Sequence, residues 1–169
     1  MNLSSTDDHK ESKIVSHHIG GGYVRLSVND DVDVIASNIR DIDALEVACM
    51  GHTPHEALQR GLRDSDACFT AVAPNGTPVA MFGAGRMQDY GFIWLLGTKD
   101  LYENRYAFIK ASRKYTQILT RPYTTTFNFV HKDNELAIKW LTFCKARFLR
   151  TVYFKDEPFY EFIIISDNV

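Results

Sequence analysis

The sequence has few of the features that mark membrane, secreted and metal-binding proteins. No apolar run is long enough to cross a bilayer, and the first residues (MNLSSTDDHKESK) lack the apolar core of a signal peptide. The three cysteines, Cys49, Cys68 and Cys144, lack C-x-x-C spacing, and each lies among apolar neighbours. We therefore predict buried, reduced thiols, no membrane contact, and a reducing compartment such as the bacterial cytoplasm.

A strong net charge is also missing, but the sum of −2 hides an asymmetry. Between Asp30 and Asp66, nine acidic and three basic residues give a balance of −6. Between Lys99 and Lys155, twelve basic and four acidic residues give a balance of +8. Nucleic-acid binding usually needs a strongly basic face, so this surface favours protein partners over nucleic acid. Two solvated faces without a partner remain an equal alternative.

The composition is that of a globular protein, with 45% hydrophobic and 24% charged residues, and 169 residues suit one domain. Residues 1–22 are polar, lack periodicity and end in three glycines. We predict a flexible N-terminal arm there, followed by a single domain at 23–169. His17 and His18 lie in the arm without a carboxylate or cysteine at ligand spacing, so we expect them to be unstructured and to bind no metal.

Apolar periodicity predicts a mixed order of strands and helices. Strand-like runs occur at 23–28, 67–73, 78–84, 92–96, 125–130, 151–154 and 159–165. Helical spacing occurs at 30–51, from Thr53 to about Leu62, at 100–121 and at 134–148. Thr53-Pro54 is typical of a helix start with Thr53 as N-cap, and Asn75-Gly76 between two apolar runs predicts a hairpin. The order predicts an α+β or α/β class: a mixed, mostly antiparallel sheet of six or seven strands with helices on both faces. The strand at 92–96, apolar on both faces, should be central and lie beside 125–130.

The stretch FNFVHKDNELAIKWLTFCKARF, from Phe127 to Phe148, joins a strand to an amphipathic helix. Asp133 or Asn134 offers a side-chain oxygen as the helix cap. Trp140 continues the apolar stripe of this helix, and we predict that it is a core residue.

This strand and helix, with an Asn three residues before an Ala-Ile pair, resemble the last unit of the GNAT superfamily of acetyl-CoA-dependent N-acetyltransferases. Four segments, TPHEALQRGL, PVAMFGAG, FIWLLGTKDL and DNELAIKWL, resemble the internal virion protein A family of T-seven-like podophages. That resemblance runs from about Val24 to Ile165 and implies a GNAT-like fold and a role in virion assembly. Lys145 and Ala146 stand where both families usually have Gly-Phe.

The GNAT resemblance implies a cofactor in the gap between 92–96 and 125–130, with its pyrophosphate on a turn of the form Q/R-x-x-G-x-G/A. Glycines there let main-chain N–H groups approach the phosphates. This chain has GTKDLYENR at that place, with one early glycine, Gly97. Asp100 and Glu103 have capping-box spacing, so we expect two carboxylates at the positive end of the next helix. Those charges would repel phosphate.

Other catalytic candidates are weak. The resemblance implies a general-acid tyrosine where this chain has Leu141, and we interpret Tyr102, Tyr106 and Tyr115 as packing residues. Glu46 could act as a general base through a water molecule, but a solvated helix glutamate is the favoured interpretation. His55 beside Glu56 is likewise interpreted as an exposed residue at a helix start.

We therefore predict a non-catalytic structural or assembly protein, without catalytic, cofactor or metal residues, that contacts other virion proteins or copies of itself. Its location would be the virion, or the host cytoplasm during assembly. The candidate partner surface is a basic stripe of Lys110, Arg113, Lys114 and Arg121. The alternative hypothesis is an acetyl-CoA-dependent N-acetyltransferase with an atypical pyrophosphate turn.

Overall fold

Eight strands form one sheet in the computed structural model, which describes residues 17–19 and 21–168. Their order across the sheet is β1-β2-β3-β4-β5-β6-β8-β7. The strands are β1 (His17–Ile19), β2 (Gly22–Leu26), β3 (Ala67–Val72), β4 (Pro78–Met87), β5 (Tyr90–Gly97), β6 (Thr125–His131), β7 (Arg147–Phe154) and β8 (Glu157–Ile165). The helices are α1 (Asn29–Ser37), α2 (Asp41–Cys49), α3 (Pro54–Asp64), α4 (Arg105–Thr120) and α5 (Glu135–Phe143), with 3-10 turns η1 (Lys99–Tyr102) and η2 (Ser166–Asn168).

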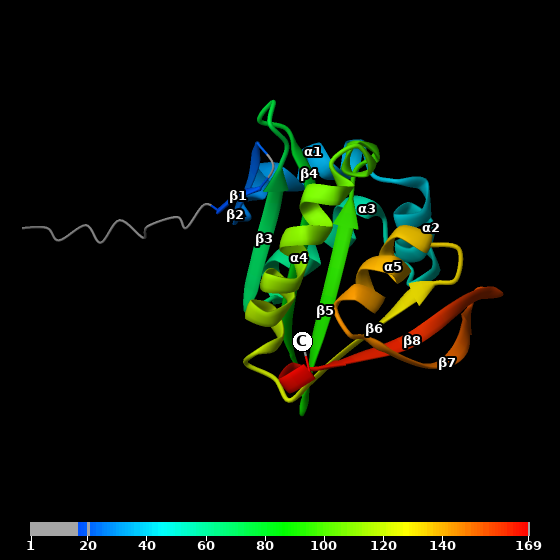
Figure 1. The fold of residues 1–169 in the computed structure, drawn as a ribbon. Helices are drawn as coiled ribbons and strands as arrows, with labels where there is room; N and C mark the ends of the chain where they lie inside the picture. Colours follow the sequence, from blue (N-terminus) through cyan, green and yellow to red (C-terminus); the bar gives the residue numbers. More distant parts are fainter. Residues whose placement is uncertain (1–16, 20, 169) are drawn as a thin grey trace, which may run out of the picture.

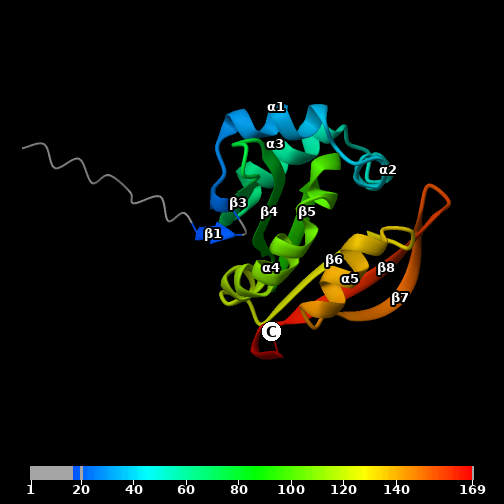
Figure 2. The same cartoon turned by 45° about the horizontal axis from the view of Figure 1, so that its top comes forward.

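The helices form two layers, one on each face of the sheet (Figure 1). Helices α1, α2 and α3 cover one face, and α4 and α5 cover the other, as the turned view in Figure 2 also shows. The helices on both faces agree with the prediction, and the short strand β1 brings the sheet to eight strands, one more than the upper end of the predicted six or seven. None of the helices in the described part of the chain is long and apolar enough to cross a membrane.

Neighbouring strands pair antiparallel except β5 and β6, which are parallel. The prediction that these two strands are central neighbours is confirmed. They pair only at Gly91 with Thr126 and at Phe92 with Phe127, and then they diverge. A gap therefore opens in the middle of the sheet toward the carboxyl ends of both strands.

The core has two parts because successive strand side chains point to opposite faces. Phe82 on β4 enters the larger cluster with Tyr115 and Trp140, and its neighbour Met81 enters the smaller cluster with Leu58. Trp140 is 8% exposed, so its predicted burial is confirmed. Cys49, Cys68 and Cys144 are buried free thiols, as predicted. Burial raises the pKa of the Cys68 thiol to about 11, which suppresses nucleophilic thiolate.

Several local signals predicted their elements correctly. Thr53 caps α3 by accepting the N–H of Glu56, whose carboxylate accepts the N–H of Thr53 in return. Asn134 caps α5 by accepting the N–H of Ala137 at 3.3 Å. The Asn75-Gly76 turn joins β3 to β4, and Gly76 has the positive φ, 85°, that such turns need.

The single helix predicted at 30–51 is wrong, because the chain breaks between α1 and α2. Ile39 forms an isolated bridge with Thr98, and the N–H of Arg40 donates to the carbonyl of Gly97 at 2.9 Å. These contacts hold the break against the carboxyl end of β5. Lys99 adds a bond from its N–H to the carbonyl of Asn38.

Two other helix predictions need correction. The helix predicted at 100–121 begins only at Arg105, after the turn η1, and neither η1 nor α4 has a side-chain cap. The capping box of Asp100 and Glu103 is therefore wrong. Helix α5 ends at Phe143, so the predicted extension to 148 is also wrong, and Lys145 turns the chain with a φ of 65°.

The structure describes only part of the predicted N-terminal arm. Met1 to Ser16 and Gly20 lie outside the described residues, and the prediction of a flexible arm stays untested there. His17–Ile19 pair with β2 as strand β1, and Gly22 begins β2, so the predicted boundary at 22 and the unstructured histidine pair are wrong.

Candidate functional site

The side chain of Asn128 bridges the gap between β5 and β6 at its narrow end. The Asn128 side chain donates from Nδ2 to the carbonyl of Ile93 at 2.7 Å and accepts the N–H of Phe129 at 2.8 Å. The Asn128 side chain thus forms a bond between the two strands where their main chains no longer pair. Beyond it, the gap is bounded by side chains and helices.

Two carboxylates of α2 occupy the wide end of the gap. Asp43 accepts the N–H of Gly97 from β5 at 2.8 Å, and Glu46 accepts the N–H of His131 from β6 at 2.7 Å. Asn134 joins them, because its Nδ2 donates to Glu46 Oε1 at 3.0 Å and to Asp43 Oδ1 at 3.3 Å. Helix α2, β5, β6 and the start of α5 therefore meet in one hydrogen-bond network.

Asp43 is the structural member of this network. Its side chain is fully buried, and the Arg40 guanidinium donates to both carboxylate oxygens, at 2.9 and 2.6 Å. Burial raises the pKa of Asp43, and the charge of Arg40 acts against that rise.

Glu46 is the chemically distinctive member, and its interpretation as a solvated helix residue is wrong. Burial and, secondly, the charge of Asp43 raise the pKa of Glu46 to about 7, although the bonds from Asn134 and His131 oppose the shift. A carboxylate that titrates near neutral pH can take and release protons under physiological conditions. Both bonds use Oε1, which leaves Oε2 on the side of the gap.

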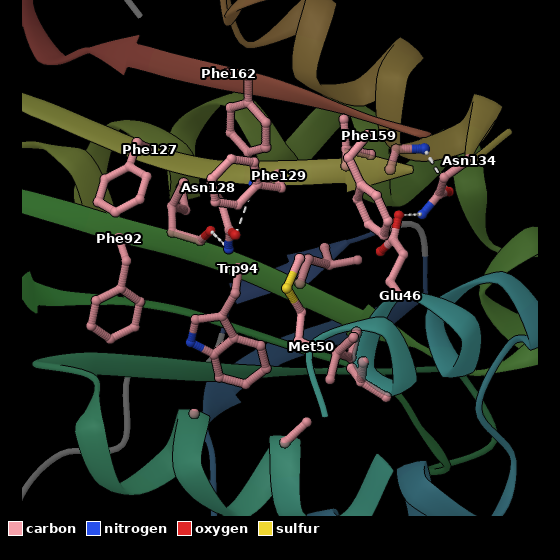
Figure 3. Close-up of a pocket in the computed structure, with 18 of the residues that line it drawn as sticks. Glu46, Met50, Phe92, Trp94, Phe127, Asn128, Phe129, Asn134, Phe159 and Phe162 are labelled. Atoms are coloured by element: carbon pink, nitrogen blue, oxygen red, sulfur yellow. Dashed lines mark hydrogen bonds between the residues drawn. The ribbon is translucent and has the colours of Figure 1, made fainter. Parts of the chain in front are cut away.

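Glu46 lines a cleft of about 680 Å³ on the face that carries α2 and α3 (Figure 3). The cleft passes into the gap as far as Trp140 and Leu141 of the opposite layer. Three strands contribute the aromatic residues Phe92, Trp94, Phe127, Phe129, Phe159 and Phe162 to its lining, and α5 contributes Trp140. Polar residues at its edge are His52, Arg60, Asp64 and Arg86.

Trp94 is fixed against α3 as one wall of the cleft. Its Nε1 donates to Ser65 Oγ at 2.9 Å, and a Cβ atom at Gly61 would collide with the indole ring. Glycine is therefore required on α3 for this ring position, and the small Ala57 on the same helix leaves space beside it.

The opposite face of the gap is nearly closed. A crevice of about 10 Å³ lies between α4 and α5, and its lining includes Arg40, Arg105 and Trp140. Trp140, which lines this crevice, and Thr98, which follows β5, have buried polar atoms, Nε1 and Oγ1, without a hydrogen-bond partner among the described residues. Such atoms are costly unless a ligand or solvent reaches them.

The turn after β5 uses its N–H groups internally. Those of Gly97, Thr98 and Lys99 donate to Asp43, Val79 and Asn38, respectively. A phosphate could not reach these three donors, which agrees with the lack of glycines in the turn.

Side chains at the start of α4 offer positive charge instead. The Arg105 guanidinium lies 4.1 and 4.5 Å from the ring centres of Tyr102 and Tyr106. Both tyrosines are exposed, so their interpretation as packing residues is wrong, whereas Tyr115 is buried as predicted. Asp100 and Glu103 are exposed and cap neither η1 nor α4.

Comparison with solved structures decides the fold. A GNAT-family acetyltransferase from Bacillus anthracis matches with a TM-score of 0.64 and 8% identity, over 90% of this chain and 99% of that chain. The ribosomal-protein-S5-alanine acetyltransferase from Vibrio fischeri matches with a TM-score of 0.63 and 13% identity, over 91% and 98%. An uncharacterised protein from Bacillus halodurans matches with a TM-score of 0.66 and 14% identity, over 92% and 91%.

This chain has a GNAT-like fold. No family model matches it, and no curated protein is similar to it. The resemblance to the internal virion protein A family thus rests on sequence segments alone, while the GNAT-like fold predicted from pattern and resemblance is confirmed.

The other residues considered in the sequence analysis lie in different parts of the structure. The four residues of the basic stripe are exposed on α4 or at its end, far from the network of Glu46 in sequence, and their role stays a prediction. Leu141 is buried beside the cleft, and His55 is exposed and pairs with Asp33. Among the described residues, no group of three potential ligands could hold a metal ion.

Sequence reasoning missed Asp43 and underrated Glu46. The two acids lie three residues apart on an amphipathic helix, so their spacing places them on one face. Both accept hydrogen bonds from Asn134, which is 88 residues from Glu46 in the chain. Only the three-dimensional contact distinguishes this pair from ordinary surface acids.

Proposed function

We propose that this chain is an acyl-CoA-dependent N-acyltransferase in which Glu46 is the general base for the acceptor amine. The observation that supports this most is a carboxylate with a pKa of about 7 in a cleft at the divided centre of a GNAT-like sheet. The similar solved structures include acetyltransferases, one of them specific for an alanine of ribosomal protein S5, which agrees with this chemistry.

This chain would have to hold the cofactor in an atypical way. When bound, acyl-CoA supplies an acyl group activated as a thioester. Trp140 Nε1 and Thr98 Oγ1 are buried donors without a partner among the described residues, and the side chains of Arg105 and Lys99 would offer cations for its phosphates. Side chains would thus take over the role of the missing glycine N–H groups, and the crevice between α4 and α5 would have to widen.

The protein's chemical role lies with the acceptor. Above pH 7, the ionised Glu46 accepts a proton from the acceptor ammonium group, so that the nitrogen gains a free electron pair. Asn134 and His131 hold Oε1, which orients Oε2 toward the cleft. The proton then leaves to water through the open side of the cleft. Leu141 has no proton to donate, so no general acid is assigned.

Calorimetry with acetyl-CoA and a transfer assay test this proposal. We expect micromolar binding, and kcat/KM should rise with pH through about 7 as Glu46 ionises. Glu46→Gln should lower kcat about 10²–10⁴-fold, the usual contribution of a general base, and leave acetyl-CoA binding unchanged. An absence of binding at millimolar acetyl-CoA would overturn the proposal.

A second candidate is the non-catalytic virion assembly protein, and the turn after β5 favours it. Its N–H groups are already bonded within the chain, as expected if phosphate binding has been lost. The protein would then act in the virion, or in the host cytoplasm during assembly, by contacting virion proteins or copies of itself through the basic stripe. No cofactor would be needed.

Particle assembly tests this second candidate. Arg113→Glu combined with Lys114→Glu should leave the monomer folded, because both side chains are exposed, but should lower its recovery in particles. The matched control makes the same change at the exposed Lys139 and Lys145. Equal losses from both pairs would indicate a general charge effect, and normal particles from the first pair would remove the stripe from the hypothesis.

A further inference from the structure

We infer that the acceptor taken by the cleft is an amine borne on a bulky apolar, preferably aromatic, group, with the ammonium at Glu46 and the apolar group between Trp94 and the phenylalanines. This deepens the proposed function, on which it rests for the fate of the amine. The binding itself needs no acyl donor.

The first support is the size and composition of the cleft. A volume of about 680 Å³ is within the range of sites for small organic ligands, about 300–1,000 Å³. Its walls are mainly apolar and include seven Phe and Trp side chains, to which Met50 adds a flexible apolar side chain. A strongly hydrated acceptor, such as a polyamine or a sugar, would lose water against these walls without new hydrogen bonds.

The second support is the position of the charge. In Figure 3, Glu46 lies at one end of the row of rings, next to Phe159 and Asn134, and Phe92 and Phe127 lie at the other end. A ligand with one cationic end and one apolar end matches this polarity. The neighbouring aromatic faces also favour an ammonium group through cation–π attraction.

The third support is the rigidity of the wall. Trp94 is held by Ser65 and by close contact with Gly61, and Gly85 gives similar close contact to Phe92. These rings cannot swing away easily, so the slot is preformed and selects flat groups. A preformed slot also lowers the entropic cost of binding.

The charged and titratable groups near Glu46 come from several elements, and His52, Arg60, Asp64 and Arg86 line the same cleft. Asp43, Arg40 and Cys49 come from the region of α2, Asn134 from the start of α5, and His131 from β6, with Glu157 and Lys155 beyond it at the β7–β8 turn. Arg40 is bonded to Asp43, and the Lys155 ammonium donates to the carbonyl of Ala48. Neither cation donates to Glu46, which leaves its charge for an incoming ammonium.

Tryptophan fluorescence gives a direct test, because Trp94 and Trp140, both tryptophans of the chain, line the cleft. The probe is 2-phenylethylamine. The two controls are 2-phenylethanol, which keeps the ring without the amine, and 1,4-diaminobutane, which keeps the amine without the ring. We expect the probe to bind at least ten-fold more tightly than either control at pH 8.

The pH dependence makes the test specific for Glu46. Its ionised fraction rises about ten-fold from pH 6 to pH 8 for a pKa of about 7, while the probe stays protonated. Affinity for the probe should therefore rise about ten-fold over this range, and affinity for 2-phenylethanol should stay constant. Glu46→Gln should remove both the pH dependence and the preference for the amine.

A second pair of variants locates the site even if Glu46→Gln folds poorly. Ala57→Phe should fill the cleft and abolish probe binding, whereas Gln59→Phe, exposed on the same helix, should leave it unchanged. Equal binding of the probe and 2-phenylethanol, no binding at all, or full binding by Ala57→Phe would each overturn the inference. Probe binding without acetyl-CoA binding would sustain the inference and refute the proposed transferase.

Discussion

The gap between β5 and β6 is open on one face of the sheet and nearly closed on the other. Toward α2 and α3 it opens into a cleft of about 680 Å³, and toward α4 and α5 it narrows to a crevice of about 10 Å³. The helices explain the contrast: α3 presents Ala57 and Gly61 to the gap, whereas α5 presents Leu136 and Trp140. A divided sheet alone therefore does not determine where a ligand enters, since the side chains of the covering helices decide.

The largest expected effect comes from removing Trp140 on the nearly closed face, which carries α4 and α5. Trp140→Ala should destabilise the protein by about 3–5 kcal/mol, because a large buried ring leaves a cavity between α5 and the sheet. Urea unfolding would measure the loss. Trp94→Ala is the matched change on the open face and should cost less, because that ring is only partly buried and already borders the cleft. Equal losses would contradict the contrast between the faces.

The next effect concerns Glu46 on the face that carries the cleft, and it is a dependence of stability on pH. The pKa of Glu46 is raised from 4.5 to about 7 in the folded state, so its contribution to stability is fully present below pH 4.5 and is lost as pH rises through 7. The shift corresponds to roughly 2–3 kcal/mol after allowance for partial exposure. Relative to Glu46→Gln, the natural protein should therefore lose about that much stability between pH 4.5 and pH 8.

Urea unfolding at several pH values would measure this difference. The control is Glu135→Gln on α5, an exposed acid that pairs with the exposed Lys139, and its removal should leave the pH profile unchanged. A Glu46→Gln profile parallel to that of the natural protein would mean that Glu46 titrates in the cleft as it does in the unfolded chain.

The sequence carried enough local information for most elements of the fold. The Thr53-Pro54 start of α3, the Asn75-Gly76 hairpin and the Asn134 cap each rest on bonds between near neighbours, so their patterns predicted them. The number and order of elements predicted a mixed, mostly antiparallel sheet, and the neighbouring, central position of β5 and β6 was part of that prediction.

What failed depends on distant contacts. Nothing local breaks the helix at Asn38 to Arg40, because neither glycine nor proline is present; the break is held by Gly97 and Thr98, nearly 60 residues away. The burial of Glu46 depends in the same way on β6 and α5. The site was therefore less predictable than the fold, since its chemistry arises where three separate segments meet.

The smallest expected effect concerns the end of α5, which lies on the nearly closed face of the gap. Lys145 has a φ of 65°, and left-handed backbone costs an ordinary residue about 1–2 kcal/mol. Its N–H donates to the carbonyl of Thr142, and that of Ala146 donates to Leu141, so the left-handed turn closes the helix in the position usual for glycine. The lysine side chain is exposed.

Lys145→Gly should therefore stabilise the protein by about 0.5–1 kcal/mol, after the greater freedom of glycine in the unfolded chain is subtracted. Thermal unfolding would show a small rise in Tm. Lys139→Gly, on the same helix but within its regular part, should instead destabilise by about 1 kcal/mol. Opposite signs at the two positions would show that the strained turn, rather than lysine charge or helix propensity, limits how firmly α5 closes the gap. A loss of stability in both variants would mean that the chain does not take the left-handed turn at Lys145.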